Sequence, residues 1–279
     1  FALLNSPHRG VHCVEQMAGA TVTLFCLYTV AHAVIAIFEI FRQACRPSGT
    51  TSIQGFFVRA AIVFFTLALV ANNSSLAAGG LKSPGRANKA VFYLGDFNHL
   101  VLLPIIIPMA GEIALRVRAE AEGSAALPPP RWLRPATWLA AVIFGAMGIY
   151  QLYEEMQQDE FPTVKHDSGV AYYAPPRESL PIGVIAVSLS VLTAGAYSAW
   201  RIQYWKLLAL QGIGLVGQVV AASSKGYVQV VSNGFEVVFM LSLALAERRF
   251  FSSNDFVVSI LQNSLGMATL LVEEDSGHA

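Results

Sequence analysis

Charged residues and cysteines are both scarce in this chain of 279 residues. Asp, Glu, Lys and Arg make up only 13% of it, about half of the share that is usual in soluble domains. Acidic and basic residues are equally numerous, at 18 each, so the net charge gives no indication of nucleic-acid binding. The three cysteines, Cys13, Cys26 and Cys45, lack CxxC spacing, and Cys26 falls inside an apolar stretch, so no structural disulfide is expected.

The short motifs that identify common enzyme classes are also missing. The sequence contains no HExxH, P-loop, GxSxG or glycine-rich dinucleotide turn. A retinal protein needs a lysine within its last span for the Schiff base. The five lysines here lie in loops or at the ends of apolar stretches, at Lys82, Lys89, Lys165, Lys206 and Lys225. The sequence therefore argues against a rhodopsin.

Apolar sequence is abundant, with 54% hydrophobic residues. A bilayer core about 30 Å thick needs about 20 apolar residues in a helix, and backbone groups within lipid must bond internally. We therefore predict an all-α fold, a polytopic membrane bundle of seven transmembrane helices within residues 1–251. The predicted spans are 17–41, 55–78, 98–117, 136–153, 180–200, 205–223 and 233–251.

The remaining residues, 252–279, are predicted to form an amphipathic tail. Its segment 256–272 is apolar but has a polar middle, which favours an interfacial helix over an eighth crossing. Ten basic residues lie on one side of the predicted bundle and seven on the other, which favours an external N-terminus and an internal C-terminus. The long loop 153–179 then lies outside, either as a cap over the bundle or as a solvated surface loop.

Polar residues near the outer ends of the spans are the best candidates for a site. Asp96 and His99 share a helix face, Glu154 ends the fourth span and Glu236 begins the seventh. Carboxylate and imidazole groups that converge from several helices can bind a divalent metal, so these four are predicted metal ligands. The amides at similar depth are predicted ligand-binding residues: Gln151, Gln218 and Asn233. The alternative is that the acids are only solvated at helix ends, where Asp96 and Glu236 also match the helix dipole.

Charged residues near the inner ends are predicted to be structural. Glu39, Glu112 and Glu247 each lie within a turn of an arginine, namely Arg42, Arg116 and Arg248, and Arg59 could pair with Glu39 or Glu112. His32 is predicted to be a hydrogen-bonded core residue.

Two spans carry backbone irregularities. Pro104 and Pro108 should kink the third span and free backbone carbonyls. Gly212, Gly214 and Gly217 in the sixth span should allow close approach of another helix. Together these two helices either enclose a small pocket or simply pack well.

One family resemblance is carried by the third and sixth spans. The stretch Asp96-Phe97-Asn98-His99, followed by Glu112, and the stretch Leu210-Gln211-Gly212 are similar to the corresponding helices of the transmembrane-45-like family. The resemblance implies a seven-helix eukaryotic membrane protein of a family whose function is largely unknown. The histidines that this family carries after its fourth helix are replaced here by Glu154 and Glu155.

Three functions stay open from the sequence. The first is a non-enzymatic accessory or scaffold component of a membrane assembly, with protein partners or further copies of itself. The second is a protein that binds or transports a small ligand or cation through the outer polar cluster. The third is a metal-dependent membrane enzyme. All three place the chain in a lipid bilayer as a multi-pass protein.

Overall fold

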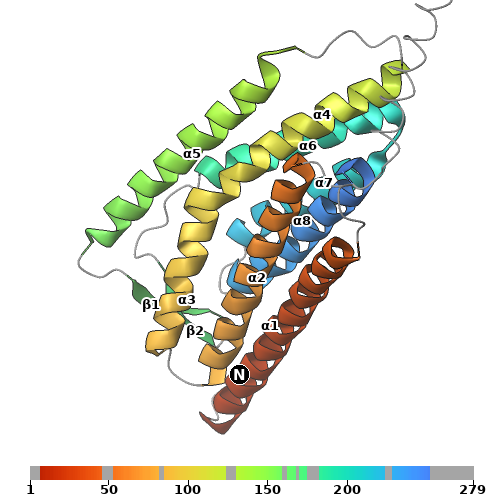
Figure 1. Cartoon of the computed structure of the whole chain (residues 1–279). Helices are drawn as coiled ribbons and strands as arrows, with labels where there is room; N and C mark the ends of the chain where they lie inside the picture. Colours follow the sequence, from red (N-terminus) through yellow and green to blue (C-terminus); the bar gives the residue numbers. More distant parts are fainter. Residues whose placement is uncertain are drawn as a thin grey trace, which may run out of the picture.

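The computed structural model describes residues 7–45, 53–81, 85–123, 130–158, 162–167, 170–174, 182–223 and 228–251. In these residues the chain forms a bundle of long helices with a small β-hairpin at one end (Figure 1). The predicted amphipathic tail, 252–279, lies outside the described residues.

The elements follow one another along the chain as eight α-helices, two short irregular helices and two strands within the described residues. The α-helices are α1 (Pro7–Ala44), α2 (Ile53–Leu81), α3 (Arg86–Phe97), α4 (Ile106–Glu122), α5 (Leu133–Met156), α6 (Ile182–Ile202), α7 (Trp205–Ser223) and α8 (Val228–Phe251). Between α3 and α4 lie the π-helix η1 (Asn98–Leu102) and the 3-10 helix η2 (Leu103–Ile105). The strands are β1 (Thr163–Asp167) and β2 (Val170–Ala174).

Six helical segments are long and apolar enough to cross a bilayer, which confirms a multi-pass helical bundle by length and composition. They are Ala18–Ala44, Phe56–Ala78, Arg86–Glu122, Leu133–Met156, Ile182–Ile202 and Val230–Phe251. The predicted span 205–223 forms α7, whose apolar part covers only Trp205–Val220. At 1.5 Å per residue this part measures about 24 Å, less than the roughly 30 Å of a bilayer core. The count of seven crossings therefore stays a prediction.

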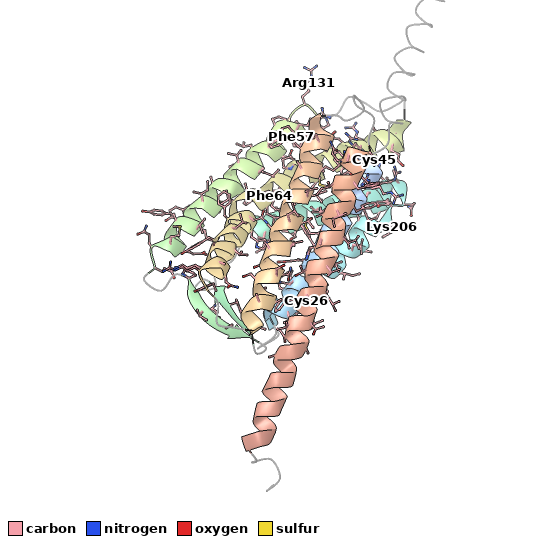
Figure 2. The ribbon with its side chains drawn as sticks, turned by 60° about the horizontal axis from the view of Figure 1, so that its bottom comes forward. Cys26, Cys45, Phe57, Phe64, Arg131 and Lys206 are labelled. Carbon is pink, nitrogen blue, oxygen red and sulfur yellow. The ribbon has the colours of Figure 1, made fainter. Side chains whose placement is uncertain are left out.

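The helices pack around one extended apolar core. In sequence order, α1 contacts α2 and α8, α4 contacts α5 and α6, and α7 packs between α6 and α8 (Figure 1). The most buried core side chains come from α2, α4, α6, α7 and α8: Ile62, Ile113, Val187, Val191, Leu207 and Leu243. Large apolar side chains also cover the outside, as Phe57 and Phe64 do on α2 (Figure 2). Such outer faces fit a lipid environment.

The two described cysteine side chains are unpaired. Cys26 and Cys45 are both exposed and free (Figure 2). Both lie on α1 or at its end, 19 residues apart in the sequence.

The segment predicted as a loop after α5 contains an antiparallel hairpin. Val164 lies opposite Tyr173, and Asp167 lies opposite Val170. Val170 is buried, and Tyr172 packs with it against a cluster formed by α1, α2 and α8, namely Phe25, Leu76, Ala77 and Val230. The described part of this segment thus covers one end of the bundle, as the capping alternative expected.

The predicted irregularity in the third span is confirmed at Pro104. Pro104 lies in η2 and cannot donate a hydrogen bond to the carbonyl of Leu100, so the regular α-helical ladder is interrupted here. Two glycines of α5 lie against the altered backbone. A Cβ atom on Gly148 would meet the Leu100 oxygen at 1.9 Å, and one on Gly145 would meet the Val101 oxygen at 3.2 Å. Only glycine allows α5 to approach this closely.

Candidate ligand-binding site

A cavity of about 420 Å³ lies beside the irregular segment of the third span. Its wall is built from α2, α3, η1, η2, α5, α6, α7 and α8. The apolar side chains that line it include Phe65, Leu69, Leu103, Leu215, Phe235, Phe239 and Met240. The polar ones are Asp96, Asn98, His99, Gln151, Glu155, Ser188, Gln211, Gln218, Ser232 and Glu236. The cavity is therefore amphipathic, with acidic and amide groups among aromatic and aliphatic walls.

Five of the seven predicted site residues line this one cavity: Asp96, His99, Gln151, Gln218 and Glu236. They come from α3, η1, α5, α7 and α8, so helices that are far apart in the sequence bring them together. The prediction that Asp96 and His99 share a face toward one site agrees with this placement.

Glu154 is misplaced in the predicted set. It accepts a hydrogen bond from the hydroxyl of Tyr150 on the exposed side of α5, and its neighbour Glu155 lines the cavity instead. Successive residues on an α-helix point about 100° apart, so the two glutamates cannot share a face. The sequence did hold the relevant signal, because Glu155 is four residues after Gln151 and shares its face.

Asn233 is not part of the cavity lining but belongs to a buried hydrogen-bond network. Its Nδ2 donates to Asn73 Oδ1 at 2.8 Å, and Asn73 Nδ2 donates to the Leu69 carbonyl at 2.9 Å. His32 is fully buried beside them, with Nδ1 2.9 Å from the Tyr28 carbonyl. The expectation for His32 as a hydrogen-bonded core residue is confirmed, and Asn233 joins α2 to α8 in the same layer.

Two carboxyl groups meet at one end of the cavity. Asp96 contacts Glu155 through its side chain, and Gln151 Nε2 donates to Glu155 Oε1 at 2.9 Å. Glu155 is only 4% exposed. Two adjacent carboxylates repel one another strongly where water is excluded, so a proton or a cationic group is needed near them.

A third carboxyl group approaches the imidazole across the cavity. His99 Nε2 lies 3.7 Å from Glu236 Oε1, which is longer than a hydrogen bond. Among the described lining residues, the buried oxygen atoms without a hydrogen-bond donor include Asp96 Oδ2, Asn98 Oδ1 and Glu236 Oε2. Asn98, which the sequence analysis did not select, is itself only 1% exposed. The cavity therefore has a surplus of acceptors.

The predicted metal ligands are not grouped as a metal site. Within the described parts of the chain, no three His, Cys, Asp or Glu side chains are arranged so that they could hold a metal ion. Asp96, His99 and Glu236 line a wide cavity, whereas the Glu154 side chain bonds Tyr150 on the outside. The divalent metal stays a prediction without a matching geometry here.

The α7 side of the cavity is fixed by close packing against α8. A Cβ atom on Gly217 would meet the Phe235 ring at 1.9 Å, so this glycine acts as the sequence predicted, whereas Gly212 has nothing within 4 Å of such an atom. Ser232 Oγ donates to Gln218 Oε1 at 3.0 Å. Gln211 donates to the Ser242 hydroxyl.

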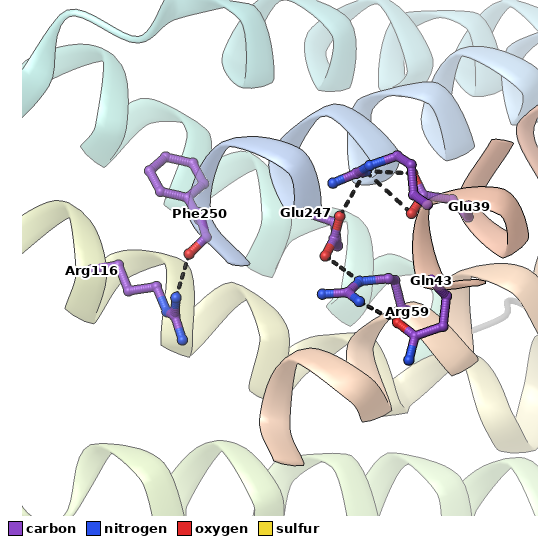
Figure 3. A network of polar contacts seen from close by, with 7 residues as sticks. Glu39, Gln43, Arg59, Arg116, Glu247 and Phe250 are labelled. Carbon is purple, nitrogen blue, oxygen red and sulfur yellow. Dashed lines mark hydrogen bonds and ion pairs between the residues drawn. The ribbon is translucent and has the colours of Figure 1, made fainter. Parts of the chain in front are cut away.

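Part of the inner charged layer forms a network of ion pairs and hydrogen bonds (Figure 3). Arg42 pairs with Glu39 at 3.1 Å, as predicted. Glu247 does not pair with its neighbour Arg248, as the sequence suggested, but binds Arg42 at 2.9 Å and Arg59 at 2.5 Å. The prediction missed this because partners from other helices are invisible to sequence spacing.

Another part of the inner layer surrounds Glu112 on α4. Arg116 lies 3.5 Å from it, which agrees with the predicted pair. Arg134 of α5 binds the same carboxylate through two hydrogen bonds of 3.0 and 3.2 Å.

Comparison of the chain with models of known protein families and with curated proteins finds no match. The resemblance to the transmembrane-45-like family stays a prediction.

Proposed function

We propose that this chain is a multi-pass membrane protein that binds a small organic cation in the cavity beside η1. In this proposal α7 completes seven crossings, the N-terminus lies outside and the cavity opens toward that side. One observation supports the binding function above the others. Asp96, Asn98 and Glu236 line the same cavity, and each carries a buried oxygen that lacks a donor among the described residues.

The electrostatics favour a positively charged ligand. Asp96, Glu155 and Glu236 line the cavity, and the described side chains around it include one histidine but no lysine or arginine. A buried acceptor without a partner costs about 1–3 kcal/mol. An ammonium group offers three donors, so it would satisfy these oxygens and offset the repulsion between Asp96 and Glu155.

The size and the apolar walls favour an organic molecule over a bare ion. Small-molecule pockets typically measure about 300–1,000 Å³, and this cavity measures about 420 Å³. Phe65, Phe235 and Phe239 line it, and aromatic faces attract cations as well as alkyl groups. An amine with an apolar body fits both parts of the wall.

The test is a binding experiment on the full chain purified in detergent. Thermal unfolding is followed with a panel of alkyl and aryl amines, and with the matching carboxylic acids as controls. We expect amines to raise the unfolding temperature and acids to leave it unchanged. Asp96→Asn and Glu236→Gln should remove most of the shift, while Glu154→Gln, on the outer face of α5, should keep it. If no amine stabilises the protein, or if Glu154→Gln behaves like the cavity variants, the proposal is wrong.

The accessory function has no comparable support. An accessory component needs apolar outer faces, but any helix that faces lipid has them as well.

A further inference from the structure

A second cavity, of about 210 Å³, lies near the N-terminal end of α5, whereas the first cavity lies near its C-terminal end. Its walls come from α2, α4 and α5, with one residue each from η2 and α8. Most of the lining is apolar, including Phe57, Ile62, Ile106, Met109, Trp138 and Phe251. The polar side chains among its described lining are Glu112, Arg134 and Thr137.

The rim of this cavity lies on the outer surface of the bundle. Phe57 is 57% exposed and Trp138 is 50% exposed, although both line the cavity. They stand on α2 and α5, on either side of α4. The cavity is therefore open sideways, toward the faces that fit a lipid environment.

Basic groups outnumber acidic ones at the polar end of this cavity. Glu112 is bound by Arg134 and Arg116, and the Arg116 guanidinium lies 4.4 Å from the centre of the Phe251 ring. Arg131, three residues before Arg134, is exposed and has no ion-pair partner among the described residues. Figure 2 shows Arg131 standing clear of the bundle at the same end as Phe57. The charge of Glu247 also acts on Arg116, so three arginines face two glutamates, and Arg131 supplies the positive surplus.

We infer that this cavity holds one acyl chain of an anionic phospholipid, with the phosphate beside Arg131 and Arg134. The apolar wall matches a hydrocarbon chain, and the sideways opening gives the chain access from the bilayer. Basic residues at the end of a transmembrane bundle attract anionic headgroups. The arginine surplus therefore distinguishes this occupant from a neutral lipid.

The test is native mass spectrometry of the full chain in detergent, with dioleoylphosphatidylglycerol and dioleoylphosphatidylcholine added separately. We expect retention of phosphatidylglycerol but little phosphatidylcholine. Arg131→Gln and Arg134→Gln should each weaken phosphatidylglycerol binding about fivefold. Arg86→Gln, which changes an exposed arginine at the start of α3, is the matched control and should leave binding unchanged. Ala61→Phe fills the cavity, which Ala61 lines, and should release the lipid.

Several outcomes would overturn the inference. It is wrong if the wild-type chain retains no phospholipid, or if phosphatidylglycerol and phosphatidylcholine bind equally. It is also wrong if the Ala61→Phe variant folds with an unchanged unfolding temperature and still binds the lipid. It is wrong as well if inorganic phosphate displaces phosphatidylglycerol as effectively as added lipid does, because the site would then bind any simple anion. If Ala61→Phe does not fold, the two arginine variants decide, because unchanged binding in both also contradicts the inference.

Discussion

The two ends of the bundle treat buried charge in opposite ways. At one end, Glu39, Arg42, Arg59 and Glu247 form ion pairs at 2.5 to 3.1 Å, and Glu39 and Glu247 are fully buried. At the other end, Asp96, Glu155 and Glu236 gather around one cavity with acceptor oxygens left over. In the first set both carboxylates are bound by arginines, although Arg59 Nη2 has no hydrogen-bond partner among the described residues. In the second set no lysine or arginine of the described lining binds the carboxyl groups.

This difference separates a structural role from a binding role. A complete network holds helices together, so removal of one member leaves an uncompensated buried charge. An incomplete set already lacks partners, so removal of one acid relieves repulsion. Residues of a binding site often reduce stability in this way. Four substitutions test the comparison.

The largest expected effect is at Arg59. Arg59→Ala removes the side chain that binds both Glu247 and Gln43 and leaves the buried Glu247 with Arg42. Breaking a buried ion pair in this way costs about 3–5 kcal/mol. Denaturant unfolding in detergent, followed by circular dichroism, should show this loss. A loss below about 1 kcal/mol would contradict the structural role of this network.

The next effect concerns the backbone that shapes the cavity. Gly148→Ala places a Cβ atom 1.9 Å from the Leu100 oxygen, so η1 or α5 must shift, at a cost of about 1–3 kcal/mol. Since Leu100 lines the cavity, amine binding should weaken as well. Gly212→Ala is the control, because nothing lies within 4 Å of its Cβ position. It should be neutral or stabilise α7 by about 0.5–1 kcal/mol. Equal behaviour of the two variants would contradict the described packing.

A smaller effect on stability is expected at Asp96, with the opposite sign. Asp96→Asn removes one of the two carboxylates that contact each other, so the free energy of unfolding should rise by about 1 kcal/mol. The affinity for the best amine should fall about tenfold or more, a change of about 1.4 kcal/mol. Calorimetry and denaturant unfolding of the same sample measure both quantities. A destabilised variant with unchanged affinity would place Asp96 in the same structural class as Arg59.

The smallest effect is expected at Glu154. Its side chain bonds Tyr150 on the exposed face of α5, so Glu154→Gln should change stability by less than about 0.5 kcal/mol. Glu155→Gln, one residue later, should reduce amine affinity. This adjacent pair compares two identical side chains that differ only in the direction they face, and equal effects would contradict the assignment of Glu155 to the site.

The helical bundle could be predicted because hydrophobic length and backbone hydrogen bonding leave few other solutions in lipid. The sequence also predicted the two layers of polar and charged residues, because the position of a residue along a predicted span gives its depth in the bundle. Partner identity was not predictable in the same way. Sequence position alone did not show that Glu154 faces outward while Glu155 lines the cavity. The predicted pairing of Glu247 with Arg248 is wrong because the arginines that bind Glu247 lie on α1 and α2.

The hairpin and the buried Asn98 were missed for another physical reason. The hairpin has strands of only five residues each and packs on the bundle through Val170 and Tyr172, so its formation depends on tertiary contacts. Asn98 lies in a π-helical turn, where the ordinary periodicity of helix faces does not apply.

The π-helical turn at Asn98–Leu102 makes chain length in this segment a determinant of the cavity. A π-turn fits one more residue into the helix than α-helical geometry would. Pro104 would still be unable to donate to the helix ladder, so deletion of one residue from this stretch would not give a regular helix but would change which of Asn98, His99 and Leu100 face the cavity that they line. The apolar face of α4 would keep its place in the core, while the wall that Asn98, His99 and Leu100 form would change. A one-residue deletion could thus erase the site without unfolding the bundle, and two sequences that differ mainly by this deletion could share a fold and not a ligand.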